Sequence, residues 1–283
     1  EDGPPAMLEA AQRAIAQGVN QYPPGAGIAP LRQAIAAQRR RKYGMDFDPE
    51  TEVLVTVGAS EAIAAAVLGL VEPGSDVMLI EPAFDTYAPV IAMAGSNRVT
   101  VPLVPDGRGF ALDVDALRAA LTPRTRAIIV NSPHNPTGMV LSDRDLRALA
   151  AFAVEADLLV ISDEVYEHLV YDGKQHLPLA TYPGMAQRTV TISSAAKMFN
   201  CTGWKIGWAC GTPELIAGVR AAKQYLSYVG GAPFQPAVAY ALDHEDAWVA
   251  DLRDSLRAKR DKLSAALAEL GFEVHDSAGT YFL

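Results

Sequence analysis

The chain has 283 residues, and half of them are apolar, which suits one large α/β domain with a smaller piece beside it. Its 24 basic and 33 acidic residues give a net charge of −9, which argues against nucleic acid and anionic membranes as partners. The two cysteines, Cys201 and Cys210, have the spacing of neither a metal site nor a disulfide framework, so we expect a cytoplasmic protein without a metal. The longest apolar stretch, residues 62–71, is too short to cross a bilayer.

Apolar runs that are typical of strands alternate with helical patterns along the chain. The predicted strands are residues 52–56, 76–80, 98–103, 126–131, 158–162, 189–193 and 205–210. The predicted helices between them are residues 60–70, 87–94, 114–121 and 142–156. Continuous apolar runs such as "AIIVN" and "LLVIS" are typical of strands buried on both faces of a parallel sheet. The alternation predicts an α/β fold, a mostly parallel seven-stranded sheet flanked by helices.

Residues 246–270 predict one long amphipathic helix that could link two domains. Residues 271–283 follow it and have the pattern of the first strand or two of another unit. So short a unit lacks the material to bury a core of its own. We therefore expect the chain to end within a second, incomplete domain.

Ligands of open parallel sheets bind at the carboxyl ends of the strands, so the residues that follow each strand are the first candidates for a site. Gly58, Ala59 and Ser60 follow the first strand, at a helix start whose free N–H groups can bind an anion. Taken alone, a helix cap that binds nothing explains these three residues better.

Two further strand ends carry polar side chains. Asn135 lies in the run "SPHNPTG", where a turn is the simpler explanation, although an Asn at a strand end can hold a ligand oxygen. We interpret its neighbour His134 as a loop residue rather than a base. Asp163 follows the fifth strand with Tyr166 three residues later, and a carboxylate there needs a cationic partner or donors unless it caps a helix.

The two glutamates of the run "DEVYE", Glu164 and Glu167, are expected to be solvated. The next strand end carries the run "SSAAKMFNCTGWKIGW", with Ser194, Lys197 and Lys205. A buried lysine can lose its proton near neutral pH and attack carbonyl groups. A single lysine in such a run is better explained by a stem that extends to water, so the argument depends on the combination.

Together the strand ends supply the parts that hold pyridoxal phosphate: a phosphate site, a partner for the pyridine nitrogen, donors to the ring hydroxyl and an imine-forming lysine. The runs "NSPHNPTG", "SDEVY" and "SSAAKMFNCTGWKIGW" resemble three motifs of the class I/II aminotransferases in type, order and spacing. These are pyridoxal-phosphate enzymes of fold type I. The resemblance extends from about Gln21 to Leu283.

The resemblance implies a role for each strand end. Lys197 would bond covalently to the cofactor and then move the proton between the substrate Cα and the cofactor's C4′. Asp163 would pair with the pyridinium nitrogen, and Asn135 and Tyr166 would donate to O3′ of the ring.

The phosphate contacts implied by the resemblance are those of Ser194 and Lys205, with Gly58, Ala59 and Ser60 at the helix start. Arginine is common in the family at the second lysine's position, and a lysine keeps the charge but loses the bidentate fork.

Two aromatic residues complete the implied site. Phe84 in "EPAFDTY" would stack on the pyridine face, although a core Phe explains it nearly as well. Tyr22 in "NQYPPGAGIAP" would reach the phosphate of the neighbouring subunit of a homodimer. The resemblance thus implies a segment with a dimer-crossing loop in residues 1–30, a cofactor-binding domain in 31–245, and the start of a small domain in 246–283.

Two parts of the family pattern are not found in these residues. The arginine that binds the substrate carboxylate belongs to the family's C-terminal part, and a stretch that helps to close the pocket belongs to its N-terminal part. We therefore expect residues 1–283 alone to bind the cofactor better than they turn over substrate.

The implied activity is transfer of an amino group, with glutamate as donor, to a 2-oxo or semialdehyde acceptor. Residues 193–211 and 226–231 are most similar to actinobacterial members that act in lysine and diaminopimelate biosynthesis, and also resemble the kynurenine and glutamine transaminases. A carbon–sulfur β-lyase of this fold would use every residue named above, because it also begins by removing the Cα proton. A cofactor-sensing regulator would need a DNA-binding module, and the acidic charge opposes that function.

Overall fold

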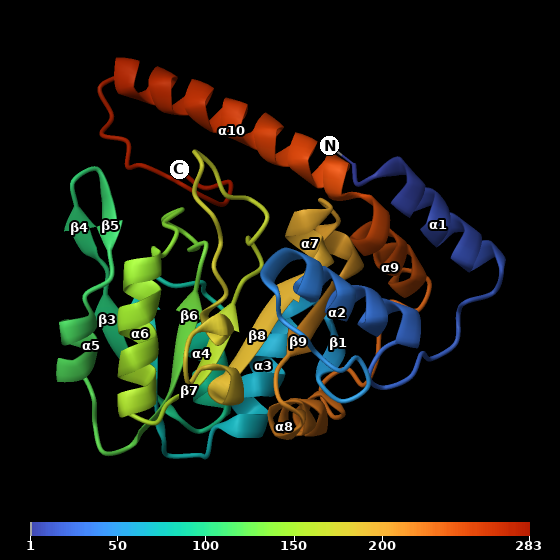
Figure 1. The fold of residues 1–283 in the computed structure, drawn as a ribbon, viewed down its shortest axis with the longest axis horizontal. Coiled ribbons are helices and arrows are strands. Elements are labelled where there is room, and N and C mark those ends of the chain that lie inside the picture. The colour runs from blue at the N-terminus through green and yellow to red at the C-terminus, as the bar shows by residue number, and fades with distance from the viewer. Residues whose placement is uncertain (1) are drawn as a thin grey trace.

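The computed structural model describes residues 2–283, which are built around one seven-stranded sheet (Figure 1). The strand order is β1-β9-β8-β7-β6-β2-β3. The strands are β1 (Val53–Val57), β2 (Asp76–Glu81), β3 (Asn97–Pro102), β6 (Thr125–Asn131), β7 (Leu159–Asp163), β8 (Thr189–Ser194) and β9 (Ile206–Cys210). All seven predicted strands are present, with each boundary within one residue of the prediction.

The sheet is mostly parallel, as predicted. The pairs β2–β3, β2–β6, β6–β7 and β7–β8 are parallel, whereas β9 runs antiparallel to both β1 and β8. The start of β9 therefore lies at the same edge as the carboxyl ends of its neighbours. A short hairpin of β4 (Val104–Asp106) and β5 (Gly109–Ala111) was not predicted, because its strands are only three residues long and exposed or half-buried.

Helices cover both faces of the sheet. They are α1 (Pro5–Ala16), α2 (Ala29–Tyr43), α3 (Gly58–Leu70), α4 (Tyr87–Met93), α5 (Val114–Ala119), α6 (Asp143–Glu155), α7 (Ala195–Met198), α8 (Pro213–Lys223), α9 (Gln235–His244) and α10 (Asp246–Glu269). Three 3₁₀ turns occupy Leu179–Thr181, Ala186–Arg188 and Thr202–Trp204. The predicted helices correspond to α3, α4, α5, α6 and α10, whereas α1, α2, α7, α8 and α9 were not predicted.

Alternate residues of each strand enter different apolar clusters, as the pleat requires. On one face, Leu54, Ile129 and Ile161 pack with α3, α4 and α8. On the other face, one cluster packs α5 and α6 over β6 and β2, and a second packs α1, α2 and α9 over β1 and β9. Between these last two clusters, the ends of β7 and β8 carry buried polar side chains.

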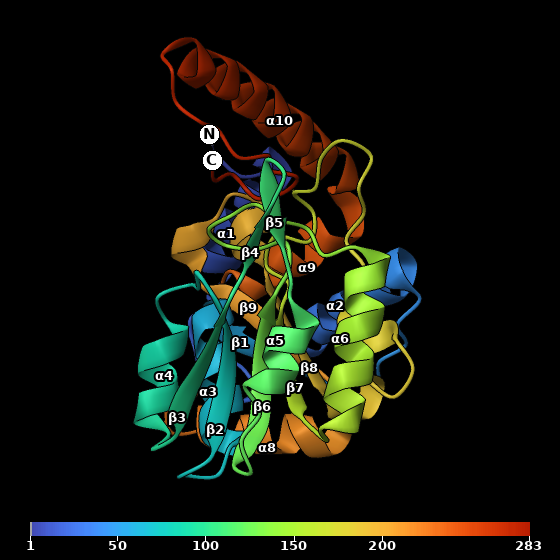
Figure 2. The same ribbon diagram turned by 90° about the vertical axis from the view of Figure 1, so that its left-hand side faces the viewer.

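The predicted long helix is α10, which buries only Val249 and Leu252 over its length and lies across one end of the molecule (Figure 1 and Figure 2). The prediction of a strand or two in residues 271–283 is wrong. Apart from one isolated bridge between Gly279 and Val170, these residues form no strand and instead run back past the loops that contain Gly138 and Leu169. None of the helices in residues 2–283 combines the length and the apolar character that a membrane span requires.

Candidate active site

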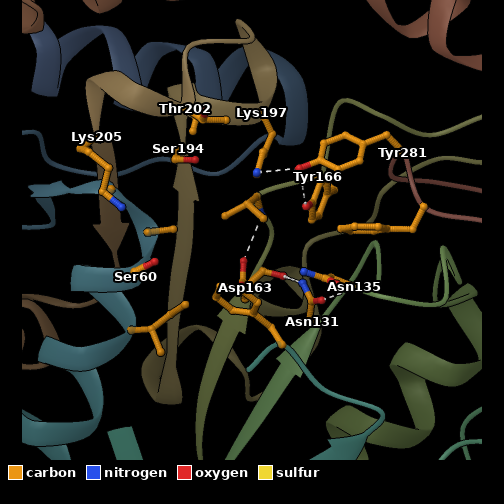
Figure 3. A pocket seen from close by; sticks show the side chains of 17 residues that line it. Ser60, Asn131, Asn135, Asp163, Tyr166, Ser194, Lys197, Thr202, Lys205 and Tyr281 are labelled. Carbon is orange, nitrogen blue, oxygen red and sulfur yellow. Dashed lines mark hydrogen bonds between the residues drawn. The ribbon is translucent and has the colours of Figure 1, made fainter. Parts of the chain in front are cut away.

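A cavity of about 300 Å³ opens at the sheet edge where β1, β6, β7 and β8 end. Every predicted site residue except Tyr22 lines it (Figure 3). The lining residues are Gly58, Ala59, Ser60, Ile63, Phe84, Asn131, Asn135, Asp163, Val165, Tyr166, Ser194, Ala196, Lys197, Thr202, Lys205, Tyr281 and Phe282. The fold brings them together because the carboxyl ends of parallel strands share one edge.

Asp163 is the last residue of β7, and its carboxylate is buried. Tyr87 Oη donates to Oδ2 at 2.6 Å and Val165 N donates to Oδ1 at 3.2 Å, but no cation of residues 2–283 forms an ion pair with it. Burial raises the pKa of Asp163 to about 6, and the two hydrogen bonds only partly oppose this. The carboxylate is therefore a buried anion without an ion-pair partner among the described residues, and Lys197 is the cation whose charge acts on it from a greater distance.

Lys197 lies on α7, directly after the end of β8, and its side chain points into the cavity (Figure 3). Its Nζ donates to Tyr281 Oη at 2.7 Å, and Tyr166 Oη donates to the same oxygen at 3.2 Å. Burial and the contact with Tyr281 raise the pKa of Tyr166 well above its usual value, so this phenol remains a donor. The amine and the phenol thus lie on the same side of the cavity.

The start of α3 forms the other end of the cavity together with Lys205 (Figure 3). Gly58 has a φ of +74°, and a Cβ built on it would lie 3.3 Å from Lys205 Cε. A Cβ on Gly207 would lie 2.5 Å from Gly58 C and 2.6 Å from Ala59 N, so only glycine allows β9 to pass this helix start. Free N–H groups beside a cation suit an anion of phosphate size.

Asn131 was not predicted as a site residue, yet it fixes the loop after β6. Its Oδ1 accepts from Asn135 N at 2.7 Å, and its Nδ2 donates to Asp163 O at 2.9 Å. Asn131 therefore ties the end of β7 to the loop that carries Asn135. Phe84 packs edge-on against Tyr87, with ring centroids 5.6 Å apart, on the cavity wall.

Tyr22 lies outside the cavity. Its side chain is 81% exposed and packs edge-on against Tyr228 at 5.7 Å between ring centroids. The predicted contact with a neighbouring subunit's phosphate remains a prediction.

The prediction that Glu164 and Glu167 are solvated is wrong, because both are buried beneath the site. Arg39 of α2 donates to Glu167 through Nη1 at 2.7 Å and Nη2 at 3.1 Å, and to Glu164 through Nη1 at 3.2 Å. Burial by itself would raise the pKa of Glu167, but Arg39 and two nearby histidines outweigh it and lower the pKa to about 2. Ser162 and Ser193 donate to these carboxylates at 2.9 and 2.5 Å.

His134 is a loop residue, as interpreted from the sequence. Its ring is buried beside Thr137, with Nδ1 2.8 Å from Oγ1, and burial lowers the pKa of His134 to about 4. The ring therefore stays neutral near pH 7.

Sequence reasoning missed four polar or aromatic lining residues, Asn131, Thr202, Tyr281 and Phe282, and the supporting residue Tyr87. A signal existed for three of them, since Thr202 also lies within the quoted run "SSAAKMFNCTGWKIGW". Tyr87 ends the quoted run "EPAFDTY", and Asn131 opens the quoted run "NSPHNPTG". Tyr281 and Phe282 gave none, since their segment had the pattern of a strand.

The model of the family "Aminotransferase class I and II" matches residues 1–283. The chain therefore belongs to the class I and II aminotransferases and is an enzyme that transfers a group. The predictions of family, fold and enzyme class are confirmed. Members of this family generally depend on pyridoxal phosphate.

Among relatives, the chain is 78% identical over 283 residues to the "Probable N-succinyldiaminopimelate aminotransferase DapC" of Mycobacterium tuberculosis, covering all of this chain and 71% of that protein. A solved structure of the N-succinyldiaminopimelate aminotransferase from Mycobacterium tuberculosis superposes with a TM-score of 0.99, covering all of this chain and 74% of that one. The methionine aminotransferase of Escherichia coli is 38% identical to this chain, and the matched region covers all of this chain and 72% of the Escherichia coli protein.

Proposed function

We propose that the chain is a pyridoxal-phosphate-dependent aminotransferase that interconverts N-succinyldiaminopimelate and the corresponding oxo acceptor, with glutamate as amino donor. The observation that supports this substrate is the 78% identity along the whole chain to the Mycobacterium tuberculosis protein of that name. The other relative named above, at 38% identity, is named for a different substrate while keeping the fold, so family membership alone supports amino transfer only.

The residues of the cavity fit pyridoxal phosphate. Asp163 is a buried anion without a cation, and the protonated nitrogen of a pyridine ring would supply one. The start of α3 and Lys205 form an anion cradle at the opposite end, and Lys197 is an amine between the walls. Asn135 and Tyr166 line the same space as donors, and Phe84 and Ser194 complete the wall.

The bound cofactor would supply an aldehyde that exchanges amino groups and a ring that withdraws electrons from the substrate Cα. We assign Lys197 Nζ to hold the cofactor covalently and, as a free amine, to move the proton at the substrate Cα. Asp163 would keep a proton on the ring nitrogen, and Tyr166 and Asn135 would orient the ring hydroxyl.

The substrate is tested by a panel assay. N-succinyldiaminopimelate with 2-oxoglutarate should give glutamate at least tenfold faster, in kcat/KM, than kynurenine, methionine or aspartate as donors, about 1.4 kcal/mol of discrimination. A preference for one of these three amino acids would refute the proposed substrate. Pyruvate and ammonia released from a cysteine conjugate, without any amino transfer, would instead assign a β-lyase.

The covalent residue is tested separately. Borohydride reduction of the pyridoxal-phosphate-loaded protein should fix the cofactor on the peptide that contains Lys197, detected by mass spectrometry. Lys197→Ala should lose both the label and the turnover while keeping its melting temperature. Label on another lysine of the wild-type protein would refute the assignment.

We also propose that the enzyme is a cytoplasmic homodimer with the three parts 1–30, 31–245 and 246–283. The surface around Tyr22 supports the dimer, because Tyr225 and Tyr228 are also exposed, at 89% and 40%. Sedimentation equilibrium should give twice the chain mass, and Tyr22→Asp should shift it towards the monomer. A monomeric wild-type protein would overturn the dimer.

A further inference from the structure

We infer that Tyr281 is a positioning residue for the Lys197 amine, and that Arg260 acts on this amine through Tyr281. The inference rests on the proposed function of Lys197 and names two residues for which that proposal has no role. Both depend on residues 276–282, called here the C-terminal strap.

Tyr281 restricts the Lys197 amine in two ways. Its Oη accepts the hydrogen bond from Nζ at 2.7 Å, and Nζ lies 5.3 Å from the centroid of its ring. The Tyr166 ring centroid lies 5.8 Å from Nζ, and the two rings meet edge-on with their centroids 5.4 Å apart (Figure 3). A lysine has four rotatable bonds, so an acceptor of this kind selects one placement of the amine among many.

The strap is fixed to the large domain by its backbone. Ala278 N and Gly279 N both donate to Gly138 O, at 3.0 and 2.9 Å, and Thr280 N donates to Leu169 O at 2.8 Å. Thr280 is fully buried with a φ of +67°, a left-handed conformation that a β-branched residue adopts only when its surroundings impose it. The conformation of the residue before Tyr281 is thus specified by contacts, not by local preference.

Arg260 joins α10 to the strap. Its Nη1 donates to Ser277 O at 2.7 Å, and Nη1 and Nη2 donate to the two oxygens of Asp172 at 2.7 and 3.1 Å. Its guanidinium also lies 4.9 Å from the ring centroid of Tyr171, whose hydroxyl donates to Thr280 O. The side chain is only 14% exposed, so water screens these contacts weakly. One cation thereby fixes both ends of the segment that precedes Tyr281.

The consequence concerns capture of the cofactor. When Lys197 is free, the Tyr281 hydroxyl holds its amine inside the cavity, where an aldehyde can reach it. Removing the hydroxyl leaves the ring contact but frees the amine. The covalent step should then slow, whereas binding that forms no covalent bond should not change.

The test starts from the cofactor-free protein and measures the covalent step and the non-covalent binding separately. Stopped-flow absorbance with pyridoxal phosphate gives the rate constant of the covalent step. Fluorescence quenching with pyridoxamine phosphate, which has no aldehyde, gives an affinity without covalent bonding. Tyr281→Phe should slow the covalent step about tenfold and change the pyridoxamine phosphate affinity less than twofold. Tyr240→Phe, an equivalent change on α9 outside the cavity, should match the wild type in both.

Arg260→Met should slow the same step, and the double variant with Tyr281→Phe should be no slower than the slower single variant. If the rate reduction of the double variant equals the product of the two single reductions, Arg260 does not act through Tyr281. A wild-type rate in Tyr281→Phe, or equal losses in both measurements, overturns the positioning role while the proposed function stands. A wild-type protein that never captures pyridoxal phosphate on Lys197 overturns the proposed function itself.

Discussion

Replacing Asp163 by Asn should stabilise the cofactor-free protein while it removes the activity. The Asp163 carboxylate is buried, and Tyr87 and Val165 are its hydrogen-bond donors. An Asn side chain carries no charge and keeps the shape and one oxygen that can accept from Tyr87, while its amide N–H faces Val165 N and loses that hydrogen bond equally at every pH. The variant therefore removes the cost of burying an unpaired anion.

The magnitude follows from the pKa of Asp163, which burial raises from 3.8 to about 6. At about 1.4 kcal/mol for each pH unit, this rise corresponds to about 3 kcal/mol. Because the folded-state pKa lies above the unfolded-state value, the folded protein holds the proton to higher pH than the unfolded chain does. The contribution of this group to stability is thus largest below pH 3.8, falls as the pH rises to about 6, and stays low above that pH.

Urea denaturation of both proteins without cofactor, from pH 4.5 to 8, measures this contribution. The difference in unfolding free energy should favour the Asn variant by up to about 3 kcal/mol at pH 8 and shrink as the pH falls. Other titrating groups are common to both proteins and cancel. Adding pyridoxal phosphate should reverse the order, since the wild type gains more from the ligand. A difference that does not vary with pH would refute the reasoning.

Three further substitutions test the surroundings of the site. Arg39→Met leaves two buried carboxylates without their cation and should lower the unfolding free energy by about 3–5 kcal/mol in urea denaturation, with Arg39→Lys losing less. Gly207→Ala places a methyl group 2.5 Å from Gly58 C and should weaken pyridoxamine phosphate binding, measured by fluorescence, by about tenfold or more. Lys205→Ala should weaken pyridoxal phosphate binding about tenfold but leave pyridoxal, which has no phosphate, unchanged.

The sheet and most of the cavity could be predicted from the sequence because they depend on local patterns. Continuous apolar runs specify buried parallel strands, and the topology then places their carboxyl ends at one edge. Lys205 reaches the same edge for a related reason, since it precedes the antiparallel strand β9. Three segments that taken singly are explained as turns or helix caps could thereby be predicted to form one site, without any knowledge of long-range contacts.

The misses at Glu164, Glu167 and Tyr281 depend on residues that are distant in sequence. Glu164 and Glu167 are buried because Arg39, some 125 residues earlier, neutralises them, and Arg39 opens a run "RRRK" that resembles an exposed helix face. Tyr281, 84 residues after Lys197, reaches the cavity because the strap folds back onto the loops that contain Gly138 and Leu169. No local pattern encodes which side chains meet across such separations.

Two buried carboxylates at the same sheet edge differ in whether the chain itself supplies a cation to pair with them. Glu167 has a bidentate guanidinium and a serine donor, and its pKa is lowered to about 2, so its charge is satisfied within the chain. Asp163, four residues earlier and equally buried, has two donors without charge, and its pKa is raised to about 6. Natural folds rarely keep an unpaired buried anion unless it serves a function. The absence of an ion pair at Asp163 within residues 2–283 therefore identifies which carboxylate a ligand completes, and the cationic ring nitrogen of pyridoxal phosphate is the partner that we propose for it.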